Sequence, residues 1–220
     1  MSKGKPVSVQ SRTTRRQALL WKSADKRRDE RQEKKMAVLT TAADLFLERG
    51  AHRVSMTDIA DELGITKPAL YNYFGSKDEI LFECFRQSNL VIGEQLDAIE
   101  ISAGGGLSQL RAFIHAYVRL IAMDYGSVMI RLEDRDLPDN LRTEVRRYKS
   151  EIDARVRATI AKGIEDGSIV PCDIKLATFA VLGALNWIGQ WFRSDGPDSV
   201  DRIGCEFAER LTLGLVSQRR

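Results

Sequence analysis

The chain has 220 residues, of which 43% are hydrophobic and 30% are charged. This length and composition allow one large or two small domains with an ordinary hydrophobic core, and they exclude the disordered and fibrous classes of protein. Three cysteines, Cys84, Cys172 and Cys205, lie far apart and form no Cys-x-x-Cys pair. We therefore expect neither a disulfide framework nor a metal site, and we expect the protein to be cytoplasmic.

The charge is distributed unevenly along the chain. Residues 1–35 contain 12 Lys or Arg and 4 Asp or Glu, whereas the rest contains 22 and 27. A basic segment of this kind suits a polyanionic partner, because cations near phosphates release counterions. A solvated terminus without a specific role is the alternative, and the charge alone does not decide between them. The polar start predicts no secretory signal.

A basic, flexible arm is predicted over residues 1–26, and four helices are predicted between it and residue 101. The first helix runs to Gly50, with its apolar face formed by Met36, Leu39, Ala43, Phe46 and Leu47. Ser55 opens a short second helix that ends at Gly64. Thr66 can cap a third helix over 67–74, and Ser76 caps a long fourth helix that begins at Lys77 and ends near residue 101.

Four more helices follow the Gly104-Gly105-Gly106 break. They are predicted over 107–125, 139–166, 174–193 and 199–216. The third of these is apolar nearly all round, but its longest uncharged run of 17 residues falls short of the roughly 20 needed to span a bilayer. No segment alternates with period two. The sequence therefore predicts an all-α protein with about nine helices and no membrane partner.

Two short helices joined by Gly64-Ile65-Thr66 have the spacing of a helix-turn-helix. The small residues Thr66, Pro68 and Ala69 at the start of the second helix would let its backbone approach base edges in the major groove. Lys67 can donate to guanine acceptors, while the hydroxyls of Tyr71 and Tyr73 can reach phosphates or bases. Spacing alone is a weak signal, because short helical hairpins are common.

The whole string from Val54 to Lys77, VSMTDIADELGITKPALYNYFGSK, resembles the N-terminal domain of the TetR family of transcriptional repressors. The resemblance extends from about Met36 to Leu81. It implies that Lys67, Pro68, Ala69 and Tyr71 face base edges. It also implies that Thr57, Tyr73 and Lys77 hold phosphates, that Ser55 caps a helix within reach of the DNA backbone, and that Leu70 and Phe74 belong to the core. Simple packing is the alternative for Tyr71 and Tyr73.

The resemblance divides the chain into an arm over 1–26, a helix-turn-helix domain over 27–80, and a ligand-binding and dimerisation domain over 81–220. Residues 36–86 carry 5 basic and 8 acidic side chains, so most of the positive charge lies in the arm. We therefore expect Arg27, Arg28 and Arg31 to contribute phosphate or minor-groove contacts.

A regulator that reads a palindrome needs two recognition helices, and one chain supplies one. The last two predicted helices are the expected homodimer surface, because the first of them is too apolar for a single chain to cover. The small residues Gly183, Ala184, Gly204 and Ala208 would allow a close approach of two subunits. The alternative is an intrachain core, which accounts for half of these residues.

Bulky apolar residues of the C-terminal part are the candidate lining of an effector site: Phe113, Tyr117, Met123, Tyr125, Met129, Trp187 and Trp191. Each of them could instead be ordinary packing. The stretch 185–196, LNWIGQWFRSDG, resembles a subgroup of the family that regulates fatty-acid and steroid catabolism, and this implies a small apolar or acyl-CoA-like effector. Arg131, Arg135 and Arg193 are candidates for its anionic headgroup.

No catalytic arrangement is evident, since His115 has no carboxylate four residues away and no cysteine has a partner. We expect no catalytic residues and no cofactor. The sequence predicts a homodimeric, ligand-responsive repressor that binds a double-stranded DNA operator. The alternatives are a helical carrier or enzyme that retains only the fold, and a protein–protein adaptor.

Overall fold

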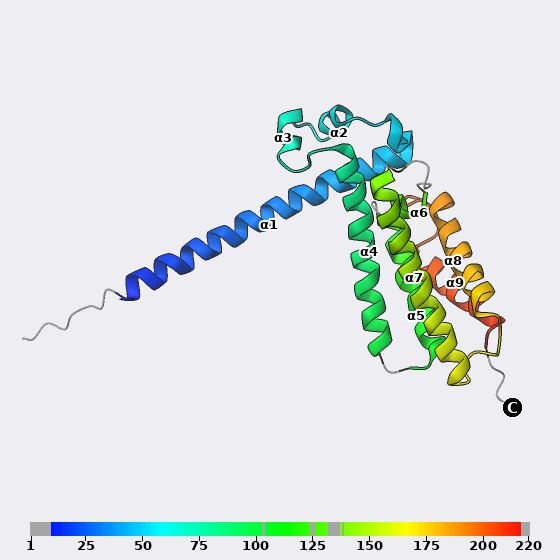
Figure 1. The fold of residues 1–220 in the computed structure, drawn as a ribbon. Helices are drawn as coiled ribbons and strands as arrows, with labels where there is room; N and C mark the ends of the chain where they lie inside the picture. The colour runs from blue at the N-terminus through cyan, green and yellow to red at the C-terminus, as the bar shows by residue number, and fades with distance from the viewer. Residues whose placement is uncertain (1–9, 103, 124–125, 132–136, 138, 217–220) are drawn as a thin grey trace, which may run out of the picture. The chain divides into compact units, whose positions relative to one another are not determined.

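The computed structural model describes residues 10–216 except 103, 124–125, 132–136 and 138, and side chains from Arg28 onward except at 129, 131 and 140 (Figure 1). Nine α-helices and one 3-10 helix make up this part of the chain, which confirms the all-α prediction. They are α1 (Gln10–Arg49), η1 (Ala51–Arg53), α2 (Met56–Glu62), α3 (Lys67–Tyr71), α4 (Lys77–Ile101), α5 (Gly106–Ile121), α6 (Gly126–Arg131), α7 (Asp139–Glu165), α8 (Ile174–Trp191) and α9 (Val200–Leu213).

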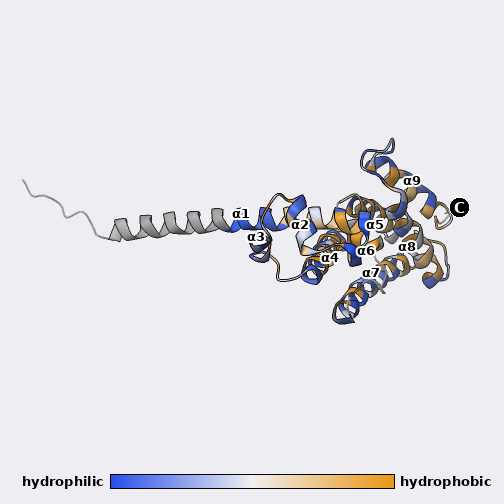
Figure 2. Cartoon of the chain, turned by 90° about the horizontal axis from the view of Figure 1, so that it is seen from above, coloured by the Kyte–Doolittle hydropathy of each residue, from blue (hydrophilic) through white to orange (hydrophobic). Residues whose placement is uncertain are grey.

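Helix α1 begins much earlier than its apolar pattern indicates. The chain divides into one unit over 1–38 and another over 39–220, and α1 runs across the boundary. Residues 10–26 of the expected arm are helical, although they show no apolar stripe. The charged segment after residue 27 is hydrophilic in Figure 2. It is rich in Arg, Lys, Glu and Gln, all of which have high intrinsic helix propensity.

Helix α5 is the centre of the second unit, because α4, α6, α7, α8 and α9 all contact it. Its inward face consists of large apolar side chains that are almost completely buried: Leu110, Phe113, Ile114, Tyr117, Val118 and Ile121. Burial of such side chains is the main source of stability in a helical domain of this size.

Close approach of α5 to α7 depends on a pair of glycines. A Cβ atom on Gly106 would lie 2.2 Å from the backbone nitrogen of Gly163, so neither helix could keep its position with a larger residue there. The Asp166 carboxylate accepts a 2.7 Å hydrogen bond from the Gly106 N–H, and Ser168 Oγ accepts one of 3.1 Å from the Leu107 N–H. These side chains satisfy the free donors of the first turn of α5.

Glycine also brings α9 against α5. A Cβ on Gly204 would lie 2.8 Å from Nδ1 of His115, and Ala208 is also buried. Gly204 and Ala208 therefore serve the intrachain core, as the alternative interpretation had it. Gly183 differs, because it is exposed and a Cβ there would meet nothing beyond its own helix backbone within 4 Å.

Helix boundaries differ from the predictions where local hydrogen bonding decides them. Helix α3 ends at Tyr71 rather than at residue 74, because the N–H groups of Tyr73 and Phe74 both turn back to the carbonyl of Leu70. Helix α5 ends at Ile121 rather than at residue 125, and the short helix α6 was not predicted. Among the helices that the structure describes, none is both long and apolar enough to cross a membrane.

Candidate nucleic-acid interface and effector cavity

The first helix of the helix-turn-helix is fixed by a reciprocal cap. Ser55 Oγ accepts a 3.2 Å hydrogen bond from the Asp58 N–H, and the Asp58 carboxylate accepts one of 2.7 Å from the Ser55 N–H. Both bonds satisfy backbone donors that the first turn would otherwise leave free. Hydrogen bonds from Ser55 hold the pKa of Asp58 below its usual value. The position of α2 is thus determined by four consecutive residues.

The turn into the second helix depends on Gly64. Its φ of 64° lies in the left-handed region, where a side chain would be strained although nothing occupies the space around it. Thr66 then caps α3, since its Oγ1 accepts a 3.4 Å bond from the Ala69 N–H, and Pro68 occupies the first turn, where no N–H is needed. The predicted cap and turn residues are all in their expected places.

Two apolar side chains attach α3 to the domain. Leu70 is 0% exposed and Phe74 is 2% exposed, as the predicted core roles require. The opposite face of α3 is open to solvent at Lys67, Pro68 and Tyr71, with Tyr71 47% exposed. This division leaves an exposed polar surface on a helix that is firmly packed from behind.

The remaining candidate DNA contacts lie at the edges of this surface. Ser55, Thr57 and Thr66 are exposed, whereas Ala69 and Tyr73 are partly buried. None of these placements contradicts the predicted DNA-facing roles, and none tests them. Ser55 is already engaged by its cap, because its hydroxyl also donates to Asp58 at 2.6 Å.

Lys77 has a structural contact that the sequence did not indicate. Its Nζ donates a 2.7 Å hydrogen bond to the carbonyl of Ala51 in η1, which ties the start of α4 to the loop before α2. An ammonium group has three donors, so this bond leaves protons that can reach a phosphate. No sequence pattern could have located this carbonyl, since the two residues are 26 positions apart.

A cavity of about 380 Å³ lies between α5, α6, α7 and α8. Its lining is mixed, with apolar side chains beside an ammonium, a carboxylate, a phenol and an amide. The lining residues are Tyr117, Ile130, Lys149, Ile152, Asp153, Phe179, Leu182, Gly183 and Asn186. This volume falls in the range of small-molecule sites, which combine mostly apolar walls with a few polar groups.

Hydrogen bonds and cations fix the polar side of this cavity. The Tyr117 hydroxyl donates a 2.8 Å bond to Asn186 Oδ1, and burial raises the pKa of Tyr117 well above its usual value. The phenol therefore remains protonated at neutral pH. Asp153 pairs with Arg157, whose guanidinium lies 5.4 Å from the ring centroid of Phe179. A cation over the ring face holds that side chain at the cavity wall.

The five predicted effector residues whose side chains the structure describes do not share one site. Tyr117 lines the cavity, and Phe113 lies buried beside it with ring centroids 5.4 Å apart. Met123 borders a separate hollow of about 260 Å³, and Trp191 packs against Phe207. Trp187 is 67% exposed on α8. Tyr125 and the side chain of Met129 lie outside the described residues.

Several lining residues were not predicted, because the sequence was searched for bulky aromatic and methionine side chains and these residues are of other kinds. Lys149, Ile152 and Asp153 come from α7, whose charged sequence predicts a solvated helix. Their spacing of three and four residues places them on one helix face, which is the signal that could have identified them. The headgroup candidate Arg193 pairs with Asp195 at 3.1 Å, while Arg135 and the side chain of Arg131 fall in the part not described.

The cysteines and acidic residues of the described chain form no group that could hold a metal ion. Burial raises the pKa of the Cys84 thiol to about 12, so its reactive thiolate form is suppressed. His115 packs against Gly204 of α9. Cys84, which is buried, and His115 therefore have packing roles.

Comparison with protein-family profiles decides the assignment. Residues 38–84 match the bacterial regulatory proteins of the tetR family, and residues 104–215 match the tetracyclin repressor-like C-terminal domain. The chain belongs to the TetR family. It is therefore a DNA-binding transcriptional regulator that recognises operator DNA as that family does, and the expectation that it is not an enzyme agrees with this assignment.

The alignments with two TetR-family relatives cover nearly the whole length of each relative. The chain is 28% identical over 187 residues to the HTH-type transcriptional repressor KstR2 of Rhodococcus jostii, covering 82% of this chain and 90% of the relative. It is 22% identical to the fatty acid metabolism regulator protein of Bacillus subtilis, covering 83% and 95%. These relatives confirm the predicted resemblance to regulators of lipid metabolism.

A solved structure shares the fold. The crystal structure of AibR in complex with isovaleryl coenzyme A and operator DNA superposes with a TM-score of 0.70 at 24% identity, over 80% of this chain and 96% of AibR. At this identity the likeness concerns the arrangement of helices. It agrees with the TetR-family assignment of both segments.

The capping carboxylate predicts how the helix-turn-helix responds to acid. Because the pKa of Asp58 is lower in the folded state, its ionised form adds stability above its usual pKa, and this contribution is lost as pH falls through the folded value. We expect Asp58→Asn to lower the free energy of unfolding by a constant amount above about pH 5, and we expect this difference from wild type to shrink steadily as the pH falls below about 4. Urea titrations followed by circular dichroism at several pH values measure this. A pH-independent difference would contradict the role of the charge.

Proposed function

We propose that this TetR-family regulator is a homodimeric repressor that leaves a palindromic operator when an acyl-CoA-like effector occupies the cavity between α5, α6, α7 and α8. The observation that carries the proposal is the presence, in one compact unit, of an exposed, capped α3 and a cavity whose lining combines apolar residues with Lys149 and Tyr117. The division into an arm over 1–26, a DNA-binding domain over 27–80 and an effector domain over 81–220 is part of the proposal.

Exposure and chemistry support direct base contacts by α3. Lys67 begins the helix, is exposed and can donate to the O6 and N7 atoms of guanine. Pro68 and Ala69 follow it with small side chains, which allow the backbone to enter the groove. The segment 36–86 has more acidic than basic residues, so we propose that Arg27, Arg28 and Arg31 supply the positive charge for phosphate contacts.

Removal of the Lys67 ammonium tests the DNA-reading role. We expect Lys67→Ala to weaken binding to an operator duplex, selected by the wild-type chain from a random pool, by about 1–3 kcal/mol. Fluorescence anisotropy of the labelled duplex measures the affinity. Arg147→Ala, which removes the same charge from an exposed position on α7, is the control and should bind as wild type does. Equal binding by both variants, or failure of the wild type to select DNA, would favour a carrier that retains only the fold.

An exposed apolar face on α8 supports the dimer. Leu176, Phe179 and Trp187 are 62%, 51% and 67% exposed. Lys175 is the one charged residue of α8, so this exposed face is mainly apolar. Gly183 lies on the same exposed face and leaves open space for the backbone of another helix. Leu213 of α9 is also 72% exposed. Patches of large apolar side chains on a monomer are typical of subunit interfaces.

Trp187 offers a direct test of this interface. We expect Trp187→Glu to raise the dimer dissociation constant at least about thirtyfold, because a large aromatic side chain at an interface contributes about 2 kcal/mol or more. Sedimentation equilibrium measures the constant. The matched control is Leu90→Glu, which places the same charge at an exposed apolar position on α4. An unchanged dimer in the Trp187 variant would refute the assignment of this face.

The cavity chemistry supports an anionic ligand with a small apolar part. Ile130, Ile152 and Leu182 provide apolar wall, and Lys149 provides a cation at the same cavity. AibR, which shares the fold, was crystallised with isovaleryl coenzyme A and operator DNA. Complete switching from 1:99 to 99:1 would require about 10⁴-fold stronger binding of the effector to the state that does not bind the operator.

The cation at the cavity is testable with isovaleryl-CoA as the probe. We expect Lys149→Ala to raise its dissociation constant about tenfold, equivalent to 1.4 kcal/mol, because one charge-assisted contact is lost. Isothermal titration calorimetry measures this, and operator affinity should remain unchanged. Arg147→Ala is the control, since Arg147 pairs with Glu144 on the same helix and does not line the cavity. Wild-type affinity in the Lys149 variant would place the thioester elsewhere.

A further inference from the structure

Residues 1–24 carry positive charge without any negative charge. They contain 6 Lys or Arg and no Asp or Glu, whereas residues 25–35 contain 6 basic and 4 acidic side chains. Within the second of these segments, Asp25 and Arg28 have the spacing of an ion pair on a helix. The first segment has no carboxylate of its own, so its charge can attract only an anion from outside it.

The cations from Arg12 onward belong to the same helix as the start of the DNA-binding domain. Helix α1 is unbroken from Gln10 to Arg49, and this range contains neither glycine nor proline (Figure 1). At about 1.5 Å per residue, residues 10–35 extend for about 39 Å, the length of about 11 base pairs of B-DNA. This part of the helix therefore matches about one turn of duplex DNA in length.

Packing does not explain the length of α1. Among its described side chains, the first that is almost completely buried is Val38, and residues 28–34 are exposed. The match with the tetR family also begins at residue 38. The start of α1 thus adds charge without adding to a hydrophobic core, and the family assignment gives it no role.

The residue pattern of this segment favours duplex DNA over a membrane or a single strand. Its bulky apolar residues stand together in the run Ala18-Leu19-Leu20-Trp21. Successive positions of a helix are about 100° apart, so this run does not form the single apolar face that a membrane-surface helix needs. Trp21 is the one aromatic residue of residues 1–35, too few for the stacking platforms that bind unpaired bases. The phosphates of a duplex require only cations.

We propose that residues 1–24 are a second DNA-binding element, which contacts the phosphates of duplex DNA outside the operator and reads no sequence. The proposal rests on the proposed function for the operator, although its charge argument applies to any duplex. It differs from the contacts proposed for Arg27, Arg28 and Arg31, which add charge to the operator contacts of α3. Specificity then comes from α3, whereas part of the affinity comes from flanking DNA and depends on salt.

Removal of three cations from the full chain measures their contribution. We expect the triple variant Arg12→Gln, Arg15→Gln, Arg16→Gln to lower the slope of log Kd against log salt concentration by about 2 to 3 per bound chain, because each phosphate contact contributes about 0.9. Fluorescence anisotropy of a labelled duplex of random sequence measures the slope. The matched control replaces the same three residues with Lys, which keeps the charge and a similar helix propensity, and it should retain the wild-type slope.

The length of the duplex tests where the segment binds. A selected operator duplex is extended by about 12 base pairs of arbitrary sequence on each side, which gives the distal cations additional phosphates. We expect this extension to strengthen wild-type binding about tenfold or more at about 0.1 M salt. The gain should fall below about threefold in the Gln variant and persist in the Lys variant. Exchange of the added sequence for another should change the affinity less than about twofold.

These measurements distinguish this proposal from the proposed function. If the wild type selects no operator but the Gln variant loses slope on the random duplex, the operator assignment fails and the second element stands. An unchanged slope in the Gln variant, or an equal loss of affinity on the short and the extended operator, overturns the proposal. Sedimentation with phosphatidylglycerol vesicles tests the other anion. Vesicle binding that the Gln variant loses, together with an unchanged DNA slope, would assign the segment to a lipid surface instead.

Discussion

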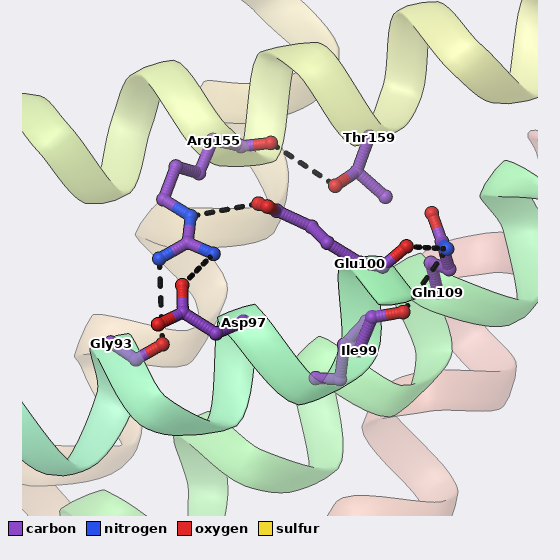
Figure 3. A network of polar contacts seen from close by, with 7 residues as sticks. All are labelled: Gly93, Asp97, Ile99, Glu100, Gln109, Arg155 and Thr159. Carbon is purple, nitrogen blue, oxygen red and sulfur yellow. Dashed lines mark hydrogen bonds and ion pairs between the residues drawn. The ribbon is translucent and has the colours of Figure 1, made fainter. Parts of the chain in front are cut away.

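Helix α4 must satisfy two sets of neighbours at once, and this constraint determines much of the rest of the molecule. Its first half contributes Ile80, Leu81 and Phe85 to the core behind the helix-turn-helix, while its last turn is bonded to α5 and α7. The middle of the helix shares in these attachments, because the Gly93 carbonyl accepts a 3.4 Å hydrogen bond from Arg155 of α7 (Figure 3).

The local elements of the DNA-binding domain could be predicted because their determinants are neighbours in sequence. The cap residues Ser55 and Thr66, the turn at Gly64 and the buried Leu70 all act over four residues or fewer. The long start of α1 was missed because its helix propensity comes from composition and produces no apolar period. Helix α6 has only six residues, too few for a periodic signal.

The cavity was predicted less well, because its walls depend on which helix faces meet. Tyr117 does line the cavity, but Trp187 lies on the open face of α8, and the contributions of α7 were not anticipated. A search for bulky aromatic side chains finds residues that pack, whether they pack around a ligand, a core or another subunit. Tyr117 and its hydrogen-bond partner Asn186 are 69 positions apart, and such a pair has no sequence signature.

Helix α3 has five residues and could not persist in isolation, since helix nucleation is costly. The turn at Gly64, the cap at Thr66 and the buried side chain of Leu70 hold it in place, and none of them depends on the side chains of its exposed face. Lys67 and Tyr71 contribute little to that framework. Mutations at these outward positions can therefore accumulate without unfolding the domain. Given the proposed DNA-reading role of α3, descendants of this chain can acquire new target sequences while inheriting the same scaffold.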